Sequence, residues 1–126
     1  MRHNMAGRHL NRSSSHRVAL FRNLMTELFR YDKIETTYAK AMSVRSQAEH
    51  LVTVAKRAKN KRDAQQSDVA ERRLVAAILT DGEVVKRLFE VTAGKYMQRP
   101  GGYTRLNRLG PRLGDGAEMV ILELIQ

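Results

Sequence analysis

The chain contains no cysteine and no tryptophan among its 126 residues. Without cysteine it can form no disulfide framework, no thiolate-bound zinc site and no thiol nucleophile. Its sequence has no apolar run close to the ~20 residues of a membrane-spanning helix, and Met1 to Met5 include no hydrophobic stretch of the kind found in signal peptides. We therefore expect a protein that works in the cytoplasm and has no membrane partner.

Motifs for catalysis are also missing. The sequence has neither a Walker loop nor a G-x-G-x-x-G motif after a strand. His3, His9 and His16 lie in a basic stretch without a nearby carboxylate, which does not suit a metal site. Asp115 and Glu118 could form a carboxylate pair, but their glycine-rich surroundings favour solvated turn residues. We expect no enzymatic activity, metal, cofactor or small-molecule substrate.

Positive charge is what the chain has in excess, with a formal net charge of +10. Residues 1–24 carry five arginines and no acid, and residues 95–112 carry four arginines, one lysine and no acid. Residues 113–126 hold only acidic charges. This balance predicts a polyanionic partner, usually nucleic acid. Arginine outnumbers lysine sixteen to seven, which favours a folded nucleic acid because guanidinium groups bind phosphate bidentately and stack on bases.

The spacing of apolar residues predicts seven regular elements. Helices are expected over residues 15–31, 38–59, 68–79 and 81–94, and strands over residues 34–36, 103–109 and 119–125. Repulsion among the bases of residues 56–62 should fray the second helix. Residues 109–117 are expected to form a long loop, and the apolar run at 119–125 is typical of a strand covered on both faces.

The order α-β-α-α-α-β-β predicts an α+β fold, with a small sheet of about three strands packed on a layer of helices. The length suits one domain, which we place at residues 14–126. Residues 1–13 have too few apolar side chains to fold alone, so we expect a basic N-terminal arm that orders on its partner.

The first basic segment combines arginine with histidine, asparagine and serine. Arginine neutralises phosphate, serine and asparagine bond to phosphate and sugar, and histidine can stack on a base. A helix start near Ser14 adds backbone N–H groups that bind anions. A solubilising tail is the alternative, although such tails usually mix charges or are acidic. The candidate binding residues are Arg2, His3, Arg8, His9, Asn11, Arg12, Ser14, Ser15, His16, Arg17 and Arg22.

A second basic segment offers a glycine pair through which the backbone could approach a phosphate. Strand alternation places Arg105 on the same face as Tyr103 and Arg108 on the other. An ordinary exposed strand with charged edge residues is the alternative. The candidates are Arg99, Gly101, Gly102, Tyr103, Arg105, Arg108 and Arg112. A third cluster, Lys56, Lys59, Lys61 and Arg62, fits either phosphate contact or a solvated helix end.

Ordered motifs along the whole chain carry a family resemblance. They include Met1-Arg2-His3, Leu10-Asn11-Arg12, Ser14-Ser15-His16-Arg17, Phe21-Arg22-Asn23, Ile34-Glu35-Thr36-Thr37, Gly101-Gly102-Tyr103-Thr104-Arg105 and Gly114-Asp115. With these motifs the chain resembles the ribosomal protein L17 family of the bacterial large subunit.

The resemblance implies a structural protein of the ribosome, in the cytoplasm, that binds 23S rRNA near the peptide exit region. It implies neighbouring large-subunit ribosomal proteins as further partners, an α+β fold and no catalysis. Two other classes of function fit the residues alone. One is a nucleoid-type DNA-binding protein, and the other is a protein–protein adaptor that uses the acidic C-terminal strand.

Overall fold

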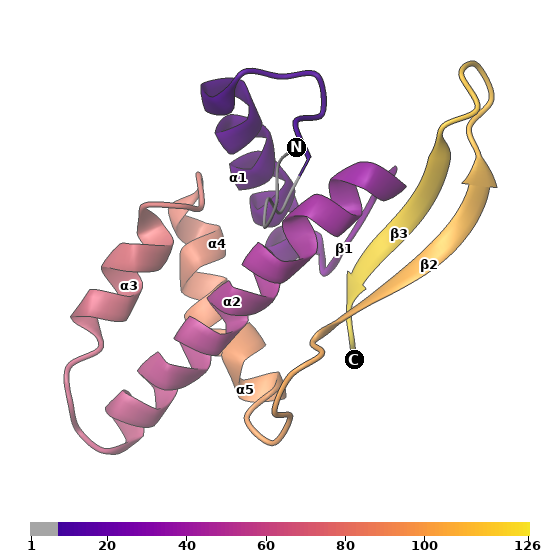
Figure 1. The fold of residues 1–126 in the computed structure, drawn as a ribbon. Helices are drawn as coiled ribbons and strands as arrows, with labels where there is room; N and C mark the ends of the chain where they lie inside the picture. The colour runs from indigo at the N-terminus through magenta and orange to yellow at the C-terminus, as the bar shows by residue number, and fades with distance from the viewer. Residues whose placement is uncertain (1–7) are drawn as a thin grey trace, which may run out of the picture.

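The computed structural model describes residues 8–126, in which α1, Ser14–Tyr31, is the first regular element (Figure 1). Ser13 caps this helix, because its Oγ accepts a hydrogen bond from the backbone N–H of His16 at 3.3 Å. Asp32 ends the helix with a left-handed φ of 66°. The predicted helix is confirmed to within one residue.

Helix α2, Tyr38–Asp63, is the longest element and crosses the middle of the molecule (Figure 1). Its alanines and valines form the predicted buried stripe, and Thr37 caps it. The predicted fraying after Lys59 is wrong. Acidic residues offset the repulsion among the bases, since Lys59 pairs with Asp63 at 3.7 Å and Lys61 pairs with Glu71 at 2.5 Å.

Four short helical segments, α3, α4, η1 and α5, follow α2. Helix α3, Val69–Ala76, ends three residues before the predicted end, and α4 spans Gly82–Arg87. The predicted cap at Asp81 is confirmed, because its Oδ1 accepts a hydrogen bond from Glu83 N at 2.9 Å. The helix then continues through a π-helical turn, η1, Leu88–Thr92, into α5, Ala93–Lys95. A π turn adds a residue that 3.6-residue periodicity does not predict.

The sheet contains β1, Lys33–Thr37, β2, Thr104–Pro111, and β3, Glu118–Leu124, in the order β1-β3-β2 with both pairs antiparallel. The long loop predicted at residues 109–117 is shorter, because β2 continues to Pro111 with a bulge at Leu109. Only residues 112–117 connect the two strands. Figure 1 shows this hairpin extending away from the helices.

The central strand β3 is covered on one face only, so the prediction of two covered faces is wrong. Val120, Leu122 and Leu124 are buried, whereas Ile121 and Glu123 on the opposite face are partly exposed. Both neighbours of β3 are antiparallel, and antiparallel sheets commonly pack one face on the core while the other faces solvent.

The core forms where α2 contacts α1, α3, η1, α5 and all three strands. Its largest fully buried side chains include Phe29, Leu51, Leu88 and Leu122, which come from α1, α2, η1 and β3. The predicted α+β class, with helices packed on a three-stranded sheet, is confirmed.

Candidate nucleic-acid interface

The start of α1 gathers the described part of the first basic segment; Arg2 and His3 lie outside the described residues. Ser14, Ser15 and His16 are exposed in the first turn of the helix, which contains no acidic residue. The unpaired N–H groups and the dipole of a helix N-terminus favour an anion. The predicted serines therefore lie at a position with the right polarity for phosphate.

Residues 9–12 form a tight turn immediately before α1. The backbone N–H of Arg12 donates to His9 O at 3.1 Å, and Leu10 and Asn11 both have φ of 54°. Two successive left-handed residues are typical of a type I′ turn. The Arg12 side chain also donates to Leu10 O at 2.7 Å, and Arg17 Nη1 lies 3.3 Å from His9 Nδ1. This part of the predicted arm is thus folded against the helix start.

The arginines around this turn are not neutralised within the described chain. Arg8, Arg12, Arg17 and Arg22 form no ion pair with a carboxylate in residues 8–126, where all thirteen acidic residues lie. Arg8 lies over the ring of Tyr38, with 6.0 Å between its Cζ and the ring centroid. An uncompensated cluster of this kind attracts a phosphate backbone.

A shallow hollow of about 530 Å³ adjoins this cluster. Its lining combines polar and apolar side chains of α1 with one residue from the segment between α3 and α4. The residues are Ser14, Ser15, Val18, Ala19, Arg22, Asn23 and Thr80. Thr80 was not predicted as a site residue, because its place beside α1 depends on packing between segments far apart in sequence.

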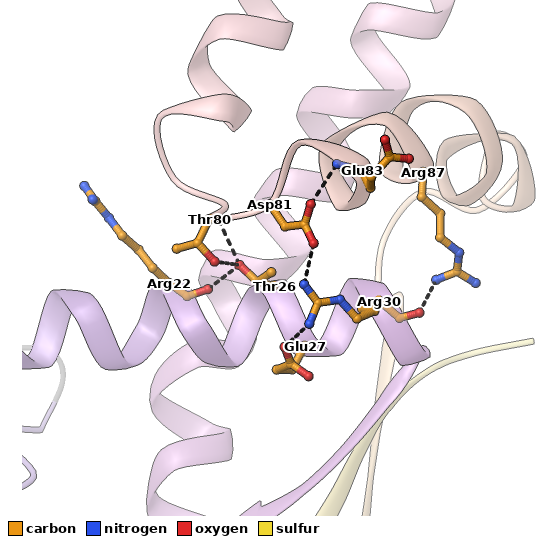
Figure 2. Close-up of polar contacts among 8 residues, drawn as sticks. All are labelled: Arg22, Thr26, Glu27, Arg30, Thr80, Asp81, Glu83 and Arg87. Atoms are coloured by element: carbon orange, nitrogen blue, oxygen red, sulfur yellow. Dashed lines mark hydrogen bonds and ion pairs between the residues drawn. The ribbon is translucent and has the colours of Figure 1, made fainter.

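Polar contacts hold α1 against the segment that leads into α4 (Figure 2). The backbone N–H of Thr80 donates to Thr26 Oγ1 at 3.1 Å, and Arg30 donates to Asp81 at 2.6 Å. The Arg30 guanidinium and the backbone N–H of Glu83 both hold the pKa of Asp81 below its usual value, the backbone bond contributing most. Figure 2 shows the Arg22 side chain pointing away from these contacts, toward the outside of the helix.

The second basic segment contains no acid of its own, but carboxylates from other parts of the chain pair with most of its basic residues. Three of its arginines form ion pairs across or within the β2–β3 hairpin. These pairs are Arg105 with Glu123 at 2.9 Å, Arg108 with Glu118 at 2.8 Å and Arg112 with Asp115 at 2.6 Å. Hydrogen bonds from Arg105 and then Asn107 lower the pKa of Glu123. The antiparallel pairing of β2 with β3 places the acidic C-terminal segment beside these arginines.

Tyr103 lies in the core rather than on the exposed face of Arg105, so the predicted shared face is wrong. Its ring packs against Tyr96 at 5.3 Å between centroids, and its hydroxyl accepts a hydrogen bond from Lys56 at 2.9 Å. Lys56 also donates to Arg99 O at 2.5 Å. These contacts give Tyr103 and Lys56 the role of holding the loop before β2.

The loop before β2 exposes both predicted glycines. Gly101 and Gly102 are exposed, and Gly102 has a left-handed φ of 63° that suits glycine. Arg99 Nε donates to Gly102 O at 3.2 Å. Thr104 anchors the other end, because its N–H and hydroxyl both donate to Glu49 Oε1 of α2, at 3.2 and 2.7 Å. The backbone here is both accessible and fixed.

The third cluster, at the end of α2, is largely paired. Lys59, Lys61 and Arg62 lie within ion-pair distance of Asp63, Glu71 and Asp68, respectively. The bond from Lys61 lowers the pKa of the Glu71 carboxyl. Arg57, absent from the predicted site residues, is exposed on the same stretch and has no carboxylate partner within residues 8–126.

Neither a metal site nor a membrane span is found in the described part of the chain. Residues 8–126 contain no group of three or more histidine, aspartate or glutamate residues arranged to hold a metal ion. No helix among these residues combines the length and apolarity needed to cross a membrane. Fold and surface together define a small, strongly basic α+β protein that presents an arginine-rich helix start.

Comparisons with known proteins identify the family. The family model for ribosomal protein L17 matches residues 20–125. Proteins named large ribosomal subunit protein bL17 from Syntrophotalea carbinolica and Trichlorobacter lovleyi are each 44% identical over the whole chain, which covers 76% and 94% of their lengths. A protein of the same name from Clostridium perfringens is 49% identical over 96% of the chain, and the match covers the whole length of that relative. The chain belongs to the ribosomal protein L17 family, which confirms the expected ribosomal and non-enzymatic class.

Proposed function

We propose that the chain is a structural constituent of the large ribosomal subunit and binds 23S rRNA chiefly through the start of α1 and the turn before it. The observation that carries this proposal is the cluster of Arg8, Arg12, Arg17 and Arg22, which has no carboxylate partner in residues 8–126. Arginines without internal partners can exchange counterions for phosphates at little cost. The relatives' name supports the ribosomal setting.

The geometry favours the backbone of folded RNA as the ligand. Exposed Ser14, Ser15 and His16 surround the helix N-terminus, while Arg22 extends from the next turns beside the hollow. Phosphates can therefore be met by N–H groups, hydroxyls and guanidinium groups at once. The turn at residues 9–12 reduces the entropy lost when residues 1–13, including Arg2 and His3, order on rRNA.

A second, weaker footprint is proposed at the loop before β2 and the start of that strand, from Arg99 to Arg105. The glycine pair 101–102 allows a close approach of the backbone to RNA, and Arg105, which pairs with Glu123, can share its guanidinium group with phosphate. Lys59, Lys61 and Arg62 would contribute in the same way at the end of α2. Two separated footprints would hold rRNA segments together near the peptide exit region during assembly and translation.

Salt-dependent binding tests the proposal. Affinity of the full chain for 23S rRNA should fall by ~10³-fold or more between 50 and 200 mM salt if about six or more phosphates are contacted. The double variant Arg17→Gln/Arg22→Gln should reduce the slope of log affinity against log salt by more than about 1. Equal slopes for this variant and the unchanged chain would contradict the assignment.

A matched control separates the site from general charge. Arg73→Gln/Lys86→Gln removes the same charge from exposed, unpaired positions on α3 and α4, and it should change the slope less. Co-sedimentation of the full chain with large subunits, with and without nuclease, distinguishes the other classes. A DNA-binding protein would bind duplex DNA equally well, and a protein adaptor would stay bound after nuclease treatment.

A further inference from the structure

The distal end of the β2–β3 hairpin, residues 109–117, carries apolar side chains that rRNA binding leaves without a role. Leu113 in the connecting turn is 94% exposed and Leu109 in the β2 bulge is 51% exposed. Pro111 between them is exposed as well. Leu113 is the most exposed of the large apolar side chains in residues 8–126, and Figure 1 shows its turn extending far beyond the helices.

This turn is held by its own hydrogen bonds. The N–H of Arg112 donates to Ala117 O at 2.7 Å, and the N–H of Gly116 donates to Arg112 O at 3.0 Å. The Arg112 guanidinium donates to both carboxylate oxygens of Asp115, at 3.0 and 2.6 Å, and Asp115 Oδ1 also accepts from the N–H of Ala117 at 3.1 Å. Leu113 is therefore presented on an ordered turn, which lowers the entropy cost of docking it.

The charge of the hairpin distinguishes a protein partner from RNA. Every arginine between residues 105 and 112 lies within 2.9 Å of a carboxylate, on Glu123, Glu118 or Asp115. A phosphate at the distal end would have to approach Asp115 and Glu118 as well as their arginine partners. An exposed leucine whose neighbour Arg112 is internally paired with Asp115 instead matches the anchor and polar rim of a protein interface.

We infer that the distal hairpin end docks on a neighbouring protein of the large subunit, with Leu113 as an anchor in an apolar pocket of that protein. The inference rests on the proposed function in one respect, namely that the partner is a ribosomal protein. The Arg112–Asp115 pair forms part of the polar rim, and Leu109 at the β2 bulge is a second exposed apolar side chain in the same hairpin end.

Photocrosslinking in purified large subunits identifies what Leu113 touches. A benzophenone amino acid replaces Leu113 in one sample and Gln66, an exposed residue between α2 and α3, in the control. The inference predicts a product at position 113 that contains a second ribosomal protein and resists ribonuclease. A product that contains only rRNA, or no product above the Gln66 control, would overturn it.

Binding of variants to large subunits depleted of this chain gives a second measurement. Burial of a leucine side chain predicts that Leu113→Ser weakens binding about tenfold or more, with an unchanged salt slope because no phosphate contact is lost. Leu74→Ser changes a 43% exposed leucine on α3 and serves as the matched control with unchanged binding. Leu113 is almost fully exposed, so thermal unfolding of the isolated Leu113→Ser variant should match that of the unchanged chain.

The two proposals fail in distinguishable ways. A flat salt response of the unchanged chain would contradict rRNA binding. Steep salt dependence of the unchanged chain together with full affinity of Leu113→Ser would refute the docking of the hairpin end and leave rRNA binding intact.

Discussion

Replacing Arg87 should destabilise the fold more than replacing any exposed arginine of the hairpin. Arg87 of α4 reaches the C-terminus of α1, where it donates to the carbonyl oxygens of Phe29 and Arg30 and to both carboxylate oxygens of Asp32. The last carbonyls of a helix have no partner within the helix, so this single side chain both satisfies them and joins α1 to α4. The glutamine amide has only two N–H donors on a shorter side chain, so Arg87→Gln leaves at most two of these four bonds.

The structure allows the size of the effect to be worked out. Hydrogen bonds to charged groups contribute about 1.5–3 kcal/mol each, but the Arg87 side chain is 33% exposed and water competes for it. Lys95 Nζ also stays 3.8 Å from Asp32 and retains part of the attraction. We expect a loss of roughly 2–3 kcal/mol for the set, which corresponds to a fall in Tm of roughly 8–12 °C for a chain of this length.

Calorimetry or circular dichroism at pH 7 measures this difference. Arg112→Gln provides the control, because it also removes an arginine that binds a carboxylate through two hydrogen bonds, but both partners are about half exposed. Its Tm should stay close to that of the unchanged chain. Equal, small shifts for Arg87→Gln and Arg112→Gln would refute the reasoning that Arg87 completes the end of α1.

Three further predictions concern pH, the core and the loop before β2. The pKa of Asp81 is lower in the folded than in the unfolded protein. The stabilising effect of its carboxylate is therefore full above the unfolded pKa of about 3.9 and is lost as the pH falls through the folded pKa. The Tm deficit that Asp81→Asn shows at pH 7 should shrink toward pH 2, and a constant deficit would contradict this. Phe29 is completely buried, so Phe29→Ala should lower the free energy of unfolding by about 3–5 kcal/mol in a denaturant titration. Lys56→Met should speed amide exchange within residues 99–104, because Lys56 holds that loop at Arg99 O and Tyr103. The same change should leave the salt slope of rRNA binding unchanged, and a reduced slope would mean that Lys56 contacts phosphate instead.

The charge distribution shows how far the sequence could predict the site. The acid-free segments 1–24 and 95–112 have the same formal charge, but the structure pairs their arginines with carboxylates to different extents. Three arginines of the second segment pair with Asp115, Glu118 and Glu123, while the described arginines of the first have no such partner. The difference arises from the pairing of β2 with β3, because acids that are distant along the chain come within hydrogen-bond distance only in the folded hairpin.

Local rules predicted most elements and failed where tertiary contacts override them. The caps at Thr37 and Asp81 and the apolar stripe of α2 follow from side-chain chemistry and spacing. The end of α2 does not, because Glu71 of α3 stabilises it from another helix. The burial of Tyr103 likewise depends on Tyr96 and Lys56, which meet it only in the fold.

The sequence by itself determined the element order, the absence of thiol chemistry, the excess of positive charge and, through its ordered motifs, the family. Those properties depend on residue identity and on spacings within a few turns of chain. Tertiary structure alone decided which arginines remain free for phosphate, that Thr80 lies beside the start of α1, and that Leu113 stands exposed at the end of a neutral hairpin. The physical reason is that ion pairing and burial depend on distances through space, which antiparallel strands and packed helices set between residues far apart in the chain.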